Sequence, residues 1–383
     1  MKDLGLNAGF IAWWDRKAAD DAPILKILWN AGCVFYVRTT QPQTLMQLET
    51  SGNLYGVTVN PFNRNLTSGG SSGGEGALIG IRGSCLGIGT DIGGSIRTPA
   101  GNCGVYALRP TSFRLPMDGL SACMMNSEQI IPVIGPLSTS LEGVKMFMKI
   151  IIAAKPWLVE PKLLPFPWKD QQDLLGKKGS KKLKIAVLWD DGVVKPHPPV
   201  IRAMKEMAQK LNGVPGVEVV DWKPYKHDEA WPILSSLYFA DGAKESSSAV
   251  DASGEPWRPL ATWLIKENPY IKDHSVADVW YWTGKRDEYK KAYAKIWNDT
   301  ATGIDENGDL QGVVDVILCP VGPGAAPLLN NAKYWGYTSQ WNLLDYPALI
   351  FPVTKVDPAI DVRDEEYKPR NEKDEFNYSL CKC

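Results

Sequence analysis

A run rich in glycine and serine between Gly69 and Gly101 constrains this chain more than any other feature. The run reads GGSSGGEGALIGIRGSCLGIGTDIGGSIRTPAG, and apolar residues recur between its glycines. A flexible linker carries few apolar residues, because apolar side chains favour burial. The run therefore predicts tightly turning backbone inside a hydrophobic core.

Two nucleotide-binding interpretations of the run fail on its residues. A P-loop requires GxxxxGK[ST], and no lysine occurs between Arg38 and Lys145. A dinucleotide fingerprint requires GxGxxG, and residues 87–93 (GIGTDIG) have one residue too many before the third glycine. A nucleophilic serine fits better, because residues 93–95 (GGS) offer successive amides to a developing oxyanion without obstructing side chains.

A serine nucleophile needs a base to remove its proton. His197, His227 and His274 all lie more than a hundred residues downstream of the run, in polar or proline-rich segments. Each of the three is expected at the surface. The pattern therefore favours a lysine as the base.

Composition and charge are those of an ordinary globular protein. The 383 residues are 44% hydrophobic and 22% charged, with a formal net charge of -1, so the chain is long enough for one large domain or two smaller ones. Balanced charge gives no electrostatic reason to expect nucleic acid as a partner. Residues 146–154 (MFMKIIIAA) are too short to span a bilayer and contain Lys149, so we expect no transmembrane segment.

Seven cysteines at irregular spacing, without a CxxC pair, indicate neither a disulfide framework nor a zinc site. No signal peptide opens the chain. Reduced thiols in the cytoplasm fit these features best, and we expect no metal and no cofactor.

Hydrophobic periodicity predicts helices that alternate with strands, which is typical of an α/β fold. The predicted helices cover residues 22–31, 143–153 and 200–211, and the predicted strands cover residues 33–38, 183–191, 217–222 and 313–320. Residues 156–182 are rich in proline and lysine, and we interpret them as a connecting region.

Three segments of the run and its surroundings resemble the amidase signature family of serine amidohydrolases. They are GGSSGG at 69–74, GTDIGGSIR at 89–97 and LRPT at 108–111. Asn60-Pro61-Phe62 resembles the fungal acetamidase-like and fatty-acid-amide-hydrolase-like branch, and further similar segments lie at 132–143, 154–161 and 345–353. The resemblance implies one domain over residues 1–383, with a signature core at about 60–112 and a mixed central β-sheet flanked by helices on both faces.

The resemblance also implies a Ser–Ser–Lys triad. Its nucleophile would be Ser95 and its bridging serine Ser71, which lie 24 residues apart (95 − 71), with a cis peptide expected between Ser71 and Ser72. Lys2, in Met1-Lys2-Asp3, would be the base, 69 residues before Ser71 (71 − 2). Because the ordinary pKa of lysine is about 10.4, this role requires burial, which favours the neutral amine.

The remaining site residues follow from the same resemblance. Substrate-binding roles, chiefly the amides that would hold the oxyanion, fall to Ser71, Ile92, Gly93, Gly94 and Ser95. Structural roles fall to Ser72 and to an ion pair between Asp91 and Arg97. By its place in PQTL, Leu45 resembles a substrate-contacting position that acts through its backbone, and core packing is the alternative.

Two functions are expected. In the first, the chain is an amidohydrolase that splits a carboxylic amide into an acid and an amine or ammonia through an acyl-enzyme on Ser95. In the second, it is a catalytically inactive amidase-like fragment, because the chain begins at the expected base and ends in a charged tail, as if truncated at both ends. The partner is a small-molecule amide; acetamide-like and longer acyl amides both remain open, and the oligomeric state is not indicated.

Overall fold

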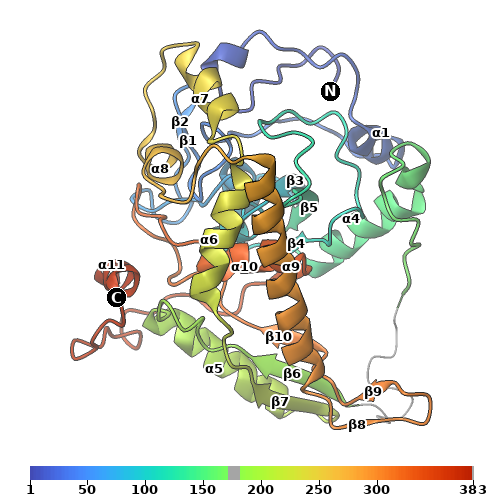
Figure 1. The fold of residues 1–383 in the computed structure, drawn as a ribbon, viewed down its shortest axis with the longest axis vertical. Helices are drawn as coiled ribbons and strands as arrows, with labels where there is room; N and C mark the ends of the chain where they lie inside the picture. Colours follow the sequence, from blue (N-terminus) through green and yellow to red (C-terminus); the bar gives the residue numbers. More distant parts are fainter. Residues whose placement is uncertain (171–181, 382–383) are drawn as a thin grey trace.

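Helices cover two separate β-sheets in this chain (Figure 1). The structure is a computed structural model that describes residues 1–170 and 182–381. Within them, one sheet has four antiparallel strands in the order β11-β4-β5-β3, and another has three parallel strands in the order β10-β6-β7. The predicted α/β class is confirmed. The antiparallel and parallel strands, expected in one central sheet, are hydrogen-bonded in two.

The antiparallel sheet and its helices come from the first part of the chain, except for the edge strand β11. Its strands are β3 (Leu86–Asp91), β4 (Tyr106–Arg109), β5 (Val133–Ser138) and β11 (Ala348–Ile350). The helices around it are α1 (Pro23–Asn30), α2 (Gly73–Gly80), α3 (Arg97–Cys103) and α4 (Leu141–Ala153).

The parallel sheet and its helices come from the second part of the chain. Its strands are β6 (Leu183–Val187), β7 (Val217–Asp221) and β10 (Val316–Leu318). The helices that follow β6 are α5 (Pro198–Asn212), α6 (His227–Tyr238), α7 (Lys244–Asp251), α8 (Pro259–Ala261), α9 (Val276–Asn298), α10 (Gly336–Leu344) and α11 (Glu372–Ser379). Two short antiparallel pairs complete the strands, β1 (Ser51–Gly52) with β2 (Gly56–Val57) and β8 (Gly303–Ile304) with β9 (Leu310–Gln311).

The antiparallel sheet is covered on both faces, because successive side chains of a strand point to opposite sides. Ala107 of β4 belongs to a core cluster with residues of α2 and α3, whereas its neighbour Leu108 packs against a cluster with residues of α1 and α4. The first cluster consists of Ile79, Ile96, Ala100, Val105, Ala107 and Leu137. The site described below therefore lies beside a rigid two-sided core.

Glycines of the run allow α2 to approach its neighbours closely. A Cβ on Gly87 would lie 1.7 Å from Oε1 of Glu75, and a Cβ on Gly76 would lie 2.8 Å from Cβ of Pro99 in α3. A side chain at Gly87 would displace the Glu75 side chain, and one at Gly76 would collide with Pro99, so glycine permits the close packing seen here. The predicted tightly packed backbone in a hydrophobic core is confirmed, and a flexible linker is excluded.

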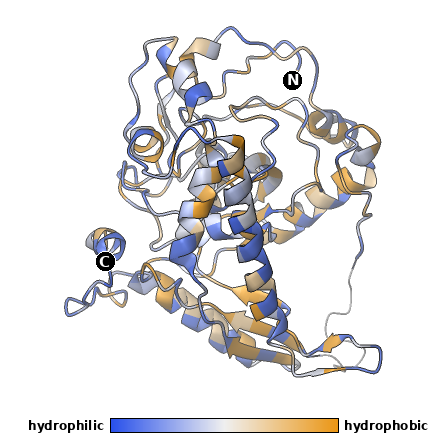
Figure 2. Ribbon diagram, in the orientation of Figure 1, coloured by the Kyte–Doolittle hydropathy of each residue, from blue (hydrophilic) through white to orange (hydrophobic). Residues whose placement is uncertain are grey.

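An aromatic cluster joins α6, α9 and α10 to the parallel sheet. Buried rings in it include Trp222, Tyr238, Tyr293, Trp335 and Trp341. Hydropathy colouring shows apolar strands in the parallel sheet and a mixed polar and apolar surface on α5 and α9 (Figure 2). This cluster places the last residue of α6 and the first turn of α10 beside the end of β3.

Most predicted elements match the structure. The helices predicted at 22–31, 143–153 and 200–211 correspond to α1, α4 and α5, and the strands predicted at 183–191, 217–222 and 313–320 correspond to β6, β7 and β10.

The strand predicted at 33–38 is wrong. No described strand pairs with this segment, and Val34 and Tyr36 are exposed. Its β-branched and aromatic residues suit a pleated sheet, but a strand also needs a hydrogen-bonded neighbour. Residues 171–181 of the predicted connecting region lie outside the described residues.

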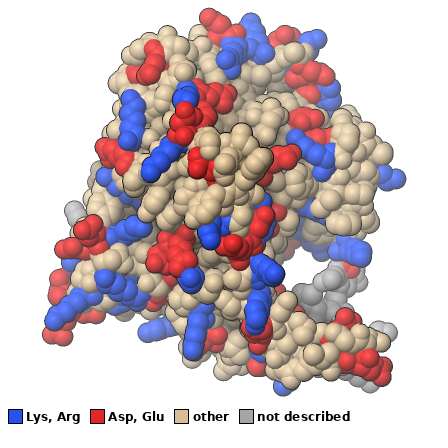
Figure 3. All heavy atoms as spheres, viewed as in Figure 1, with Lys and Arg blue, Asp and Glu red and all other residues tan. Residues whose placement is uncertain are grey.

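The surface carries both signs of charge. On the face drawn in Figure 3, lysine and arginine are interspersed with aspartate and glutamate, in keeping with the net charge of -1. Among the described residues, no helix is both long and apolar enough to cross a membrane.

Candidate active site

Ser95 lies in a loop, residues 92–96, that connects β3 to α3. The strand ends at Asp91 and the helix begins at Arg97. The amide of Thr98 donates to the carbonyl of Gly94 at 2.7 Å, which fixes the loop to the first turn of α3. Gly94 has a φ of 137°, a conformation that other residues rarely adopt. Ser95 itself is only 4% exposed.

Ser71 lies two residues before α2, next to the N-cap residue Ser72, and is 5% exposed. The hydroxyl of Thr50 donates to the carbonyls of Gly69 and Ser71, at 3.0 and 3.2 Å. The cis peptide lies between Gly70 and Ser71. The expected position between Ser71 and Ser72 is therefore wrong by one bond, because the resemblance identifies the serine but not which of its two peptide bonds is cis.

The two serine segments are joined by their backbones. The amide of Ser72 donates to the carbonyl of Ser95 at 3.1 Å. The side chain of Ser72 accepts from the amide of Thr90 at 3.2 Å, which links the start of α2 to the end of β3. Ser72 thus links the two serine segments, and its neighbour Ser71 lies near the loop that carries Ser95.

Asp91 and Arg97 form the expected ion pair, and both are buried. Arg97 donates through Nε to Oδ2 and through Nη2 to Oδ1 of Asp91, at 3.0 and 2.9 Å. Burial alone would raise the pKa of Asp91, but the charge and hydrogen bonds of Arg97, the charge of Arg109 and the hydrogen bond from Asn342 together outweigh it and lower that pKa to about 2. The same carboxylate accepts from the amides of Gly94 and Ile96. The pair therefore braces the loop from within.

The amide of Gly94 differs from the expectation. It donates to Oδ1 of Asp91 at 2.9 Å and is thereby directed into the protein, so it is not an available oxyanion donor. The amides of Ile92, Gly93 and Ser95 donate to no acceptor within residues 1–170 and 182–381. These three amides remain to hold a developing negative charge.

Two side chains from the second part of the chain hold the carbonyls of the loop. Tyr238 donates its hydroxyl to the carbonyl of Ile92 at 2.6 Å, and Thr338 donates to the carbonyl of Gly93 at 2.7 Å. Asn342 of α10 donates to Asp91 at 2.9 Å. Sequence reasoning missed these residues, and no local motif marks them, because each lies more than 140 positions from its partner.

Lys2 is exposed, in the coil that precedes the first short helix, and its backbone amide donates to Asp21 at 2.7 Å. No hydrogen bond joins its side chain to Ser71 in the described part of the chain. The expected burial of Lys2 is therefore wrong for this structure. The geometry unites Ser71, Ser72, Ser95, Asp91 and Arg97, and it does not unite Lys2 with them.

Leu45 has a positive φ of 60° and packs against a cluster that contains Phe10, Trp13 and Val250. The side chain of Leu45 therefore packs against the core, which is the alternative to a substrate contact. A contact between substrate and the Leu45 backbone stays a prediction.

The expectation of three surface histidines is wrong for two of them. His197 is buried and bonds through Nε2 to the carbonyl of Asn377 at 2.9 Å, and His227 is buried at the start of α6. Neither makes a hydrogen bond to Ser71 or Ser95 among the described residues. No group of three or more His, Cys, Asp or Glu residues in the described segments could hold a metal ion.

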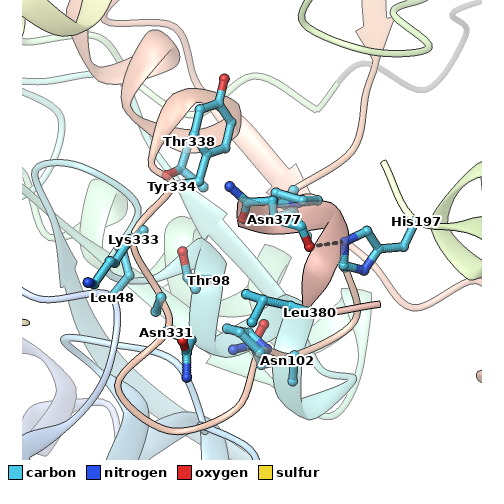
Figure 4. A pocket seen from close by; sticks show the side chains of 17 residues that line it. Leu48, Thr98, Asn102, His197, Asn331, Lys333, Tyr334, Thr338, Asn377 and Leu380 are labelled. Atoms are coloured by element: carbon cyan, nitrogen blue, oxygen red, sulfur yellow. Dashed lines mark hydrogen bonds between the residues drawn. The ribbon is translucent and has the colours of Figure 1, made fainter. Parts of the chain in front are cut away.

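A small cavity of about 70 Å³ is lined in part by Thr98 of α3 and Thr338 of α10, and by no residue of the loop 92–96. Figure 4 shows side chains from distant segments around it, among them Thr98, Thr338 and His197. A Cβ on Gly94 would lie 3.0 Å from Oγ1 of Thr98 and 2.5 Å from Oγ1 of Thr338, so the cavity wall adjoins the loop. Oγ1 of Thr98 is buried and has no hydrogen-bond partner within the described residues.

Comparisons with known proteins give the family of this chain. The amidase family profile matches residues 1–371. The chain belongs to the amidase signature family. Its family and relatives are those of amide hydrolases.

Two fungal relatives of this amidase cover nearly all of it. It is 38% identical over 376 residues to an acetamidase of Emericella nidulans, covering 98% of this chain and 67% of the relative. It is 37% identical over 372 residues to an acetamidase of Aspergillus oryzae, covering 97% and 67%.

Among solved structures, fatty acid amide hydrolase superposes with a TM-score of 0.89 and 32% identity. The match covers 99% of this amidase and 65% of that hydrolase, so the chain spans slightly under two thirds of the hydrolase's length.

Proposed function

We propose that this chain hydrolyses linear carboxylic amides through an acyl-enzyme on Ser95, with Ser71 as the proton relay. The main support for this proposal is a hydrogen bond between the two serine segments: the amide of Ser72 donates to the carbonyl of Ser95 at 3.1 Å. This bond sets the residue after Ser71 against the nucleophile's own backbone. The same loop carries the amides of Ile92, Gly93 and Ser95, which donate to no acceptor within the described residues.

The proposed reaction needs no group beyond the chain, the amide and water. Oγ of Ser95 attacks the amide carbon and passes its proton to Oγ of Ser71, while Ser71 passes its own hydroxyl proton to the amide nitrogen. The carbonyl oxygen gains negative charge, which the amides of Ile92, Gly93 and Ser95 stabilise by hydrogen bonds. The oxyanion then re-forms the carbonyl, the C–N bond breaks, and the protonated nitrogen leaves as an amine or ammonia. Water attacks the resulting ester and releases the acid, which restores Ser95.

The proposed substrate is an amide with a short acyl group. Two relatives that match nearly the whole chain are named acetamidases. The names of these two relatives are the support for a short acyl group.

A fluorophosphonate probe tests the nucleophile. The wild-type chain is expected to form a covalent adduct, and Ser95→Ala is expected to abolish it. Ser379→Ala, at an exposed serine of α11, is the control and should label like the wild type. Absence of labelling in folded wild-type protein would overturn the proposal and favour the inactive-fragment alternative.

A series of linear amides from acetamide to octanamide tests the substrate. Ammonia release is expected to fall as the acyl group lengthens beyond three or four carbons. A rise in kcat/KM along the series would overturn the short-acyl proposal and leave the nucleophile assignment intact.

A further inference from the structure

We propose that Tyr238 is a positioning residue for this hydrolysis, because its hydroxyl sets the orientation of the peptide that carries the Gly93 amide. The inference rests on the proposed function of Ser95. Tyr238 does not touch the reacting atoms in this scheme. It acts through the carbonyl of Ile92, to which it donates at 2.6 Å.

The physical link is the planarity of the peptide group. The carbonyl of one residue and the amide of the next belong to the same rigid plane and point in opposite directions. A hydrogen bond that holds the Ile92 carbonyl on the side of Tyr238 therefore directs the Gly93 amide to the other side. A flip of this plane would remove the Gly93 donor and place a carbonyl oxygen where the oxyanion forms.

Three successive peptides of the loop, from Ile92 to Ser95, each have a partner on the carbonyl. The carbonyl of Gly94 accepts from the amide of Thr98, a bond to α3 that fixes the Ser95 amide. The carbonyl of Gly93 accepts from Thr338, and this peptide carries the Gly94 amide that bonds to Asp91. Tyr238 holds the Ile92–Gly93 peptide, whose amide is a proposed oxyanion donor.

Glycine makes such a holder necessary. Gly93 has no Cβ to limit rotation, and backbone that contains glycine populates more conformations than other backbone. A Cβ on Gly93 would lie 2.7 Å from the Tyr238 hydroxyl and 2.6 Å from the ring of Trp335, so a larger residue cannot replace glycine there. The hydrogen bond from Tyr238 thus restricts the orientation of the Ile92–Gly93 peptide, which the glycine backbone alone does not restrict.

Tyr238 is suited to this task by its surroundings. It is the last residue of α6, 3% exposed, and its ring packs edge-on against Trp335 at 6.4 Å. Burial raises the pKa of its hydroxyl well above the ordinary tyrosine value, so the group stays a donor. Removal of one oxyanion donor typically slows an enzyme by about 10²–10³. If the Gly93 amide is still present but free to rotate, we expect the rate of hydrolysis to fall about tenfold or more.

The decisive variant is Tyr238→Phe, which deletes the hydroxyl and keeps the ring. We expect kcat for acetamide, and the rate of fluorophosphonate labelling, to fall about tenfold or more while KM changes less than about twofold. Binding of a trifluoromethyl ketone, whose adduct carries an oxyanion, should weaken by a similar factor. Tyr293→Phe is the matched control: Tyr293 is buried in the same aromatic cluster, and within the described residues its hydroxyl makes no hydrogen bond to the loop 92–96.

A second replacement separates positioning from packing. Tyr238→4-aminophenylalanine restores a donor at the ring's end and is expected to recover most of the lost rate. Unchanged kcat in Tyr238→Phe would overturn the proposal. So would an equal loss in Tyr238→Phe and the 4-amino variant, since packing alone would then explain it. Wild-type protein without any labelling would instead contradict the proposed function of Ser95.

Discussion

Arg97 and Asp91 form a fully buried ion pair in which Nη2 of Arg97 lies 2.9 Å from Oδ1 of Asp91. The pair closes the loop between β3 and α3 on the side away from solvent. Arg97 also donates to the carbonyl of Thr338 at 2.7 Å and to Oδ1 of Asn342 at 2.6 Å. One guanidinium therefore ties the loop of Ser95 to α10.

Arg97→Met should destabilise the protein strongly. The change removes the positive charge and leaves the Asp91 carboxylate buried without its partner, which typically costs about 3–5 kcal/mol. Urea unfolding measures the loss in the free energy of unfolding. Lys26→Met, at an exposed pair with Asp20, is the control and should have no measurable effect. Equal stability of the two variants would contradict the buried-pair account.

Gly94→Ala should abolish most of the reactivity of Ser95. The new Cβ would lie 2.5 Å from Oγ1 of Thr338, and a φ of 137° disfavours any residue other than glycine. We expect a stability loss of about 1–3 kcal/mol and labelling slowed at least tenfold. Gly104→Ala is the control, because Gly104 also has a positive φ but a Cβ added there would meet no atom within 4 Å. Wild-type labelling in Gly94→Ala would contradict the loop geometry.

His227 should make the protein less stable as the pH falls. Burial lowers its folded-state pKa to about 4, from an ordinary value of 6.5. Below pH 6.5 the unfolded chain binds a proton that the folded chain refuses, so stability is lost progressively between about pH 6.5 and 4. A difference of about 2.5 pKa units corresponds to about 3 kcal/mol. His227→Leu should remove this dependence, which the difference between wild-type and variant unfolding curves measures.

Asp191 should have the opposite effect in an overlapping pH range. Burial raises its folded-state pKa to about 6, from 3.8. The folded chain then takes up a proton first as the pH falls from about 6 to 4, and stability rises. Asp191→Asn should remove this rise and still accept from the amides of Val193 and Val194. Difference curves of the same sign for Asp191→Asn and His227→Leu would show that one of the two directions is wrong.

Lys2→Ala should leave fluorophosphonate labelling of Ser95 within about twofold of the wild type. Lys2 is exposed, so the burial that favours a neutral lysine base is missing. Ser71→Ala is the comparison and should slow labelling about 100-fold or more, because it removes the proton relay. Equal loss in both variants would show that Lys2 reaches Ser71 and acts as the base predicted from the sequence.

Features that depend on residues close together in the sequence could be predicted from local sequence patterns. Residues 183–191 predicted a buried strand and residues 217–222 a further strand, and both contribute strands to the parallel sheet. Residues 69–97 predicted a packed glycine-rich core and an Asp91–Arg97 pair, because these features lie within one short stretch of sequence.

Features that depend on distant partners could not be predicted in this way. Residues 33–38 have strand composition but lack a paired neighbour, and His227 is buried by segments that its flanking polar residues do not reveal. Tyr238 and Thr338 have no distinctive local sequence, because only the fold places them at the carbonyls of Ile92 and Gly93.

The span of these contacts along the chain affects how the protein matures. Ile92 and Tyr238 are 146 residues apart, and Arg97 and Asn342 are 245 apart. During synthesis on a ribosome, the serine loop emerges long before α6 and α10 do. A nascent chain should consequently acquire its chemical reactivity only after α6 and α10 have emerged and folded against the loop, so that a shorter polypeptide carries an unreactive Ser95.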